Sequence, residues 1–179
     1  KYYKNNNDFG IVLDQTPFYA ESGGQVSDIG NLRIKDFNFI VNDVQENNGE
    51  FIHLGVIKSG NIKNISKVLA SIDIERRSSI QRNHTATHLL HKALKEILGE
   101  HVQQAGSLVQ HDSLRFDLTH YKKISREQIK KIERNVNAII LKNQNVATSI
   151  KQYNDAKSEG AISLFGEKYG DEVRVVNIP

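Results

Sequence analysis

The chain has 179 residues, enough for one large domain or two small ones. It contains no cysteine, which excludes disulfides and thiolate metal ligands from this stretch, and no apolar run approaches the ~18 residues that a membrane span needs. Its 24 Lys and Arg against 21 Asp and Glu give a net charge of +3, which permits a polyanionic partner without requiring one. We therefore expect a cytoplasmic globular protein without a membrane partner, and a start at Lys1 rather than Met suggests a piece of a longer protein.

Residues 1–74 are expected to form a small antiparallel, barrel-like subdomain. Runs of β-branched and aromatic residues predict strands at 9–13, 31–44, 51–56 and 67–74. Turn signals separate these runs at Gly23-Gly24, at Asn47-Asn48-Gly49 and at Ser59-Gly60-Asn61. Strands of this length and spacing favour a sheet or barrel with the glycine turns on its rim.

Residues 75–179 are expected to form an α+β core. Asn83 is a plausible N-cap for a helix over 84–98 that ends at Gly99, and Ser125 with Gln128 has the spacing of a capping box for a second helix. The remaining predicted elements are strands at 102–109, 113–118, 146–153 and 173–176 and a short helix at 154–159. The whole chain is thus predicted to be α+β, with a boundary near residues 71–75.

Two histidines on the first predicted helix are candidate metal ligands. His84 and His88 are four residues apart, so their imidazoles lie on one helix face and can bind the same ion. Histidines at this spacing also occur by chance on exposed helices, and His91, on the same stripe, is interpreted as a polar edge residue rather than a third ligand. No Glu follows His84, so the zinc-protease pattern is missing. The other candidates show no ligand spacing: His101, His111, Asp112, Asp117 and His120.

A glycine pair and a glutamine are the second signal. Gly23 and Gly24 allow the backbone to approach a substrate closely and leave amide donors open, and Gln25 follows them directly. An ordinary rim turn is the alternative interpretation. Gln104, on the strand after the histidine helix, could point into the same cleft, but taken alone it is interpreted as a surface residue.

Basic residues gather in two places. One group is Arg76, Arg77 and Arg82, and the other comprises Lys122, Lys123, Arg126, Lys130, Lys131 and Arg134. For the second group, the common interpretation is a solvated helix face. Contact with a polyanion is the alternative.

Taken together, five segments resemble the editing domain of alanyl-tRNA synthetases in order along almost the whole chain. They are residues 16–30, 82–99, 104–109, 114–117 and 161–176, the last including Leu164-Phe165-Gly166-Glu167-Lys168-Tyr169. Free-standing alanyl-tRNA editing proteins share the histidine helix and the Gly-Gly-Gln segment, whereas the Phe-Gly-Glu-Lys-Tyr stretch is closer to the synthetase-embedded form. Threonyl-tRNA synthetase editing domains share the helix alone.

The resemblance implies hydrolysis of the ester in mischarged seryl- or glycyl-tRNA(Ala), within an ATP-using ligase. It implies that His84 and His88 are zinc ligands and that Thr87 and Gln104 act in editing. Gly23, Gly24 and Gln25 would line the pocket, and Arg115 would meet the tRNA. The implied partners are tRNA(Ala) and the remainder of the parent synthetase.

The chain departs from the family pattern in its zinc ligands. The family takes its other two ligands from a Cys-Gly-Gly-Thr-His-type segment after the strand that corresponds to 173–176, and this chain ends at Pro179. We therefore expect a trimmed fragment with half of a metal site, weak zinc binding and little deacylase activity. The rival hypotheses are a non-catalytic tRNA-binding module and a structural zinc module.

Overall fold

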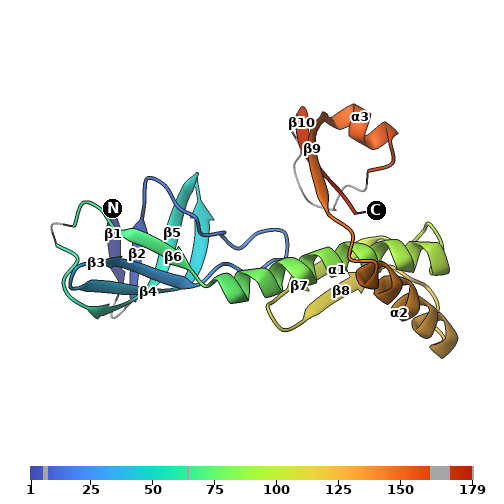
Figure 1. The fold of residues 1–179 in the computed structure, drawn as a ribbon, viewed down its shortest axis with the longest axis horizontal. Helices are drawn as coiled ribbons and strands as arrows, with labels where there is room; N and C mark the ends of the chain where they lie inside the picture. Colours follow the sequence, from blue (N-terminus) through green and yellow to red (C-terminus); the bar gives the residue numbers. More distant parts are fainter. Residues whose placement is uncertain (6–7, 64, 162–169, 179) are drawn as a thin grey trace. The chain divides into compact units, whose positions relative to one another are not determined.

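The computed structural model describes residues 1–5, 8–63, 65–161 and 170–178 (Figure 1). The chain forms two compact units. The first unit consists of Lys1–His84 and Ser107–Arg115, and the second of Thr85–Gly106 and Phe116–Pro179. The boundary expected near residue 74 coincides with the start of a helix, while the compact units divide ten residues further along it.

A six-stranded antiparallel sheet makes up most of the first unit, which confirms the expected α+β class. Its strands are β1 (Tyr2–Asn5), β2 (Asp8–Val12), β3 (Gly30–Ile34), β4 (Phe37–Asn47), β5 (Glu50–Ser59) and β6 (Leu69–Ile72). The order across the sheet is β1-β2-β5-β4-β3-β6 (Figure 1). Leu32, Phe39, Val41 and Val44 are almost fully buried and form the centre of its core.

The predicted single strand at 31–44 is two strands joined by a tight hairpin. Ile34 pairs with Phe37, and the two loop residues are Lys35 and Asp36. Lys35 has a positive φ of 44°, a conformation that usually selects Gly or Asn, so the composition carried no signal for this turn. The turn at Asn48-Gly49 is confirmed, because both residues have positive φ and join β4 to β5.

The histidine helix, α1 (Ile74–Leu98), begins ten residues before the predicted start. Asp73, not Asn83, is the N-cap, since its Oδ1 accepts a hydrogen bond from the Arg76 amide at 2.9 Å. The first ten residues contain a single fully buried apolar side chain, Ile80, so they show no apolar periodicity. The predicted end is confirmed: Gly99 has φ 116°, and its amide donates to the Lys95 carbonyl at 2.9 Å.

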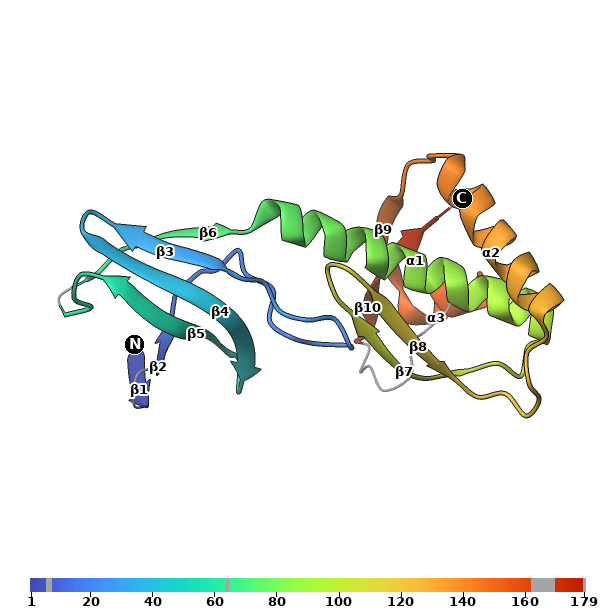
Figure 2. The same ribbon diagram turned by 90° about the horizontal axis from the view of Figure 1, so that it is seen from below.

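The second unit has its own core against the C-terminal half of α1. Helix α2 (Arg126–Leu141) lies alongside α1 (Figure 2), and the hairpin of β7 (Gln104–Val109) and β8 (Leu114–Leu118) contributes its two ends, while its central part, Ser107–Arg115, belongs to the first unit. Leu94, Val102 and Ile132 are its buried centre. The predicted capping box of α2 is confirmed, because Ser125 and Gln128 exchange both hydrogen bonds.

The last described elements are β9 (Ala147–Gln152), α3 (Tyr153–Ser158) and β10 (Glu172–Asn177). β9 and β10 pair antiparallel, with Ile150 opposite Arg174, and the predicted strands and short helix are confirmed. The Phe-Gly-Glu-Lys-Tyr stretch lies outside the described residues. Among the helices in the described part of the chain, none is long and apolar enough to cross a bilayer.

Candidate functional site

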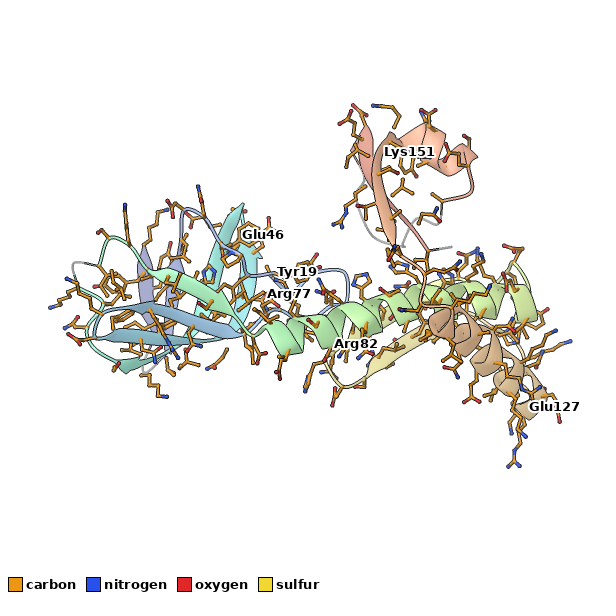
Figure 3. All side chains as sticks on the ribbon, in the orientation of Figure 1. Tyr19, Glu46, Arg77, Arg82, Glu127 and Lys151 are labelled. Atoms are coloured by element: carbon orange, nitrogen blue, oxygen red, sulfur yellow. The ribbon has the colours of Figure 1, made fainter. Side chains whose placement is uncertain are left out.

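The loop that carries the glycine pair is anchored to the start of α1 by a buried ion pair. Asp28 is 2% exposed, and Arg77 donates from Nε to its Oδ1 at 2.8 Å and from Nη2 to its Oδ2. The Asp28 carboxylate also accepts the Tyr19 amide at 2.7 Å, so it links both flanks of the glycine turn to the helix. Tyr19 and Arg77 are labelled in Figure 3. The hydrogen bond to Asp28 raises the pKa of Arg77.

The other basic residues near the start of α1 are also engaged within the fold. Arg76 donates to the Ser27 carbonyl at 2.7 Å, and Arg82 to the Ser79 hydroxyl at 2.7 Å. Two of the three arginines that the sequence grouped as a possible polyanion contact therefore hold the loop before β3 in place.

A buried histidine fixes the beginning of the same loop. His53 is fully buried, its Nδ1 donates to the Ile11 carbonyl at 2.9 Å, and its Nε2 accepts the Thr16 hydroxyl at 2.7 Å. The Thr16 oxygen in turn accepts the Phe18 amide at 3.1 Å. Burial lowers the pKa of His53, so the ring is neutral and can keep both partners.

The glycine turn packs directly on the backbone of β7. Gly23 and Gly24 have φ values of 58° and 81°, and a Cβ at Gly24 would lie 2.5 Å from the Ser107 carbonyl oxygen. The Gly24 carbonyl accepts the Val109 amide at 2.7 Å, and the Val109 carbonyl accepts the Val26 amide at 3.1 Å. Only glycine permits this approach, because any side chain at position 24 meets the neighbouring strand.

This packing places Gln25 against the first histidine. Gln25 is 8% exposed, and its Oε1 lies 2.6 Å from Nδ1 of the half-buried His84. An amide oxygen only accepts, so Nδ1 carries the proton and the lone pair of the neutral ring is on Nε2. A ring nitrogen in that state suits a metal ion or a proton, and metal-binding histidines usually donate their other ring N–H to an acceptor that holds the ring in place.

The other predicted site residues of α1 and β7 belong to the second unit. Thr87 is 6% exposed and His88 is half-buried, both on the unbroken helix α1 that also carries His84. Gln104 opens β7, and its amide oxygen is buried, so its interpretation as a surface residue was wrong. This burial could not be predicted from the sequence because β7 alternates only weakly between apolar and polar residues.

His91, interpreted from the sequence as an edge residue, is also buried. It is 4% exposed, and its ring centroid lies 5.1 Å from that of Phe116. Burial and the nearby Lys95 lower its pKa, so it is neutral in the folded chain. It is part of the core of the second unit.

The described residues do not form a complete metal site. Within residues 1–5, 8–63, 65–161 and 170–178, no group of three or more His, Asp, Glu or Cys side chains is placed to hold a metal ion. A protein zinc site needs three or four ligands. The donor chemistry of His84 and His88 fits zinc, but as two ligands of a larger set.

Arg115, the residue predicted to meet the tRNA, is exposed on β8 in the first unit. Asn83, which the sequence assigned to a helix cap, donates instead to the Gln110 carbonyl at 2.8 Å and so ties α1 to the β7–β8 turn. Neither this role nor that of His53 could be found from spacing, because their partners lie 27 and 42 residues away.

Comparison with known proteins relates the chain to aminoacyl-tRNA ligases. Residues 1–76 match the family model described as tRNA synthetases class II (A). The chain is 53% identical over 172 residues to the alanine–tRNA ligase of Thermoanaerobacter sp. (strain X514), which covers 96% of the chain and 20% of that ligase. The alanine–tRNA ligases of Clostridioides difficile (strain 630) and Rhodopseudomonas palustris (strain ATCC BAA-98 / CGA009) are 52% and 48% identical, over 94% of the chain and 19% of each ligase. The chain thus spans about a fifth of the length of these homologous enzymes.

Proposed function

We propose that the chain is the proofreading part of an alanine–tRNA ligase and takes part in hydrolysing the ester of serine or glycine on tRNA(Ala). Its likeness to alanine–tRNA ligases over nearly its whole length supports the enzyme class. The observation that carries the proofreading assignment is the Gln25–His84 hydrogen bond at 2.6 Å. This contact joins the glycine turn to the histidine helix, as a shared site requires.

The chemical need for such a site follows from the size of alanine. A pocket for a methyl group cannot exclude glycine by size, and it rejects one added hydroxyl only weakly. A second site that hydrogen-bonds the serine hydroxyl reverses this selection, because alanine lacks that group. Ligases that discriminate between such small side chains commonly add a hydrolytic site of this kind.

The reaction is attack of water on the aminoacyl ester carbonyl. The new C–O bond forms from the water oxygen, the bond to the ribose oxygen breaks, and the proton lost by water replaces the amino acid on that ribose oxygen. In our proposal the Thr87 hydroxyl recognises the serine side chain, and Gln104 orients the ester or the water. The Gly23-Gly24 backbone lines the pocket, and Arg115 contacts the RNA phosphates.

Zinc is the metal that this proposal assigns to the site. His84, through Nε2, and His88 would supply two ligands, and Gln25 would hold the His84 ring in the tautomer that binds metal. Bound zinc can lower the pKa of a water molecule or hold the substrate amino group. The other ligands would come from outside the described residues, so we expect this chain alone to bind zinc weakly and to deacylate slowly.

The test compares the chain with a longer form of the protein that continues past Pro179. Zinc content and hydrolysis of seryl-tRNA(Ala) and alanyl-tRNA(Ala) are measured for both forms. We expect the longer form to bind zinc and to hydrolyse only the seryl ester, with the activity reduced at least 100-fold in His84→Ala. Tight binding of one zinc and full activity in the short form would contradict the half-site.

Variants of the longer form distinguish the rival functions. Thr87→Val and Gln104→Ala should lower hydrolysis, while His111→Ala, at an exposed histidine on the β7–β8 turn, is the matched control. A non-catalytic tRNA-binding module predicts no hydrolysis in any form and binding that is unchanged by these variants. A structural zinc module predicts unfolding when the metal is removed. The proposed enzyme is cytoplasmic, and its partners are tRNA(Ala) and the rest of the ligase.

A further inference from the structure

The second unit carries a cluster of three rings that the proposed proofreading site does not use. Nε2 of His101 and Nδ1 of His120 are 2.9 Å apart, and the Tyr121 ring centroid lies 4.8 Å from that of His101 and 5.3 Å from that of His120. Tyr121 is 75% exposed. An exposed aromatic ring that is held by two neighbours presents a flat, preformed surface to solvent.

The backbone around the rings is well fixed. The Gln103 amide donates to the Thr119 hydroxyl at 3.1 Å, and the Thr119 amide donates to the Gln103 carbonyl at 3.0 Å. Val102, between His101 and Gln103, is fully buried. The ring-bearing segments are therefore positioned by a hydrogen-bonded pair and a core residue, and the rings need little ordering when a ligand binds.

Many basic residues follow this cluster in the sequence. Residues 119–134 contain six basic and two acidic residues, in a chain whose net charge is only +3. The Lys122 ammonium lies 5.6 Å from the centre of the Tyr121 ring. In Figure 3, long side chains with nitrogen at their tips extend from the end of α2 that bears the labelled Glu127.

The cations of α2 form a stripe that faces away from the core. Arg126, Lys130 and Arg134 are spaced four residues apart, opposite the buried Ile132, and all three are exposed. Within the described residues, none of the six basic side chains of 119–134 forms an ion pair. Their charge is thus available to an external partner.

We propose that the ring cluster and the α2 stripe form a docking surface for unpaired nucleotides of an RNA. Bases stack on exposed aromatic rings, and phosphates bind exposed Lys and Arg, so the two features together match a nucleotide strand. An acidic protein segment would bind the cations but would not require an exposed cluster of aromatic rings. This surface binds without hydrolysing, and it rests on the proposed function only for the identity of the RNA.

The test is fluorescence anisotropy with a labelled single-stranded RNA of about eight nucleotides, a length within the usual range for one binding module. Tyr121→Ala should weaken binding about tenfold, whereas Tyr121→Phe, which keeps the ring, should stay within about twofold. Far-UV circular dichroism checks that each variant is folded. Because Tyr121 is so exposed, its loss removes little packing.

A matched charge comparison tests the stripe. Each phosphate contact contributes about 0.7 to the slope of log K against log salt concentration for a single strand. The variant R126A/K130A/R134A removes three cations and should therefore lower this slope by about 2. The control K58A/K63A/K67A removes three exposed lysines from the first unit and should leave the slope unchanged.

Three results would overturn the proposal: no RNA binding by the unsubstituted chain, equal weakening by the two triple variants, or unchanged binding in Tyr121→Ala. The last, combined with binding of an acidic peptide, would assign the surface to a protein partner. If the proofreading proposal is wrong, the result is different: hydrolysis of seryl-tRNA is absent, but the affinity for this RNA is unchanged.

Discussion

Gly24→Ala is expected to destabilise the first unit much more than Gly49→Ala, although the two glycines share the same backbone φ of +81°. An alanine in this left-handed region costs about 1–2 kcal/mol at either position. The surroundings differ. A Cβ at Gly24 would lie 2.5 Å from both the carbonyl and the hydroxyl oxygen of Ser107, whereas at Gly49 it meets nothing within 4 Å.

The extra cost at Gly24 follows from how firmly its neighbour is held. The Ser107 hydroxyl can rotate away, but its carbonyl belongs to β7, which the Val109 amide and carbonyl bind to the glycine turn. Overpacking of this kind costs about 1–3 kcal/mol. Gly24→Ala should therefore lose about 2–5 kcal/mol in total, and Gly49→Ala about 1–2 kcal/mol.

Urea unfolding followed by circular dichroism measures both variants against the unsubstituted chain, with the slope m checked for equality. In thermal unfolding, each kcal/mol corresponds to about 2–4 °C for a protein of this length. If the two variants lose the same free energy of unfolding within about 0.5 kcal/mol, the close approach of the glycine turn to β7 is refuted.

Three further predictions concern the interactions that hold the loop and the second unit. Burial lowers the pKa of His53 below 6.5, so the free energy of unfolding should be fully present above about pH 6.5 and fall below it, where the unfolded ring takes up a proton. Between about pH 7.5 and about pH 5.5, the free energy of unfolding measured in urea should fall less in His53→Gln than in the unsubstituted chain. An equal fall in both would contradict this assignment. Asp28→Asn leaves Arg77 without its carboxylate and should cost about 3 kcal/mol, whereas Glu50→Gln, in an exposed ion pair, should change little in the same assay. Ser125→Ala removes the N-cap of α2 and should cost about 1 kcal/mol, measured as loss of helical signal in a thermal scan; no change would mean that the capping box adds nothing.

Elements with a strong local pattern were predicted correctly from the sequence. The start of α2 depends on Ser125 and Gln128, three residues apart, and the β4–β5 turn on Asn48-Gly49, so a short window contains the whole interaction. The β3–β4 hairpin was missed because Lys35 takes a positive φ without Gly or Asn to mark it. Pairing of β3 with both β4 and β6 holds that turn, and pairing partners are set by the sheet rather than by the turn itself.

The first ten residues of α1, and the arginines among them, also depend on partners that are distant in the sequence. A single buried residue, Ile80, produces no apolar periodicity, so this part of the helix could not be predicted from the sequence. In the fold, Asp73 caps it and the loop before β3 packs on it. Arg77 was grouped with surface cations, but its carboxylate partner Asp28 is 49 residues away. Charge along the sequence does not reveal which cations a fold will bury.

By itself, the sequence determined the spacing of His84 and His88 on one helix, because this spacing follows from helix geometry within a few residues. Only the tertiary structure decided which nitrogen of His84 carries the proton. The acceptor that selects it is the Gln25 amide, 59 residues away, and a hydrogen bond over that separation exists only after the chain has folded.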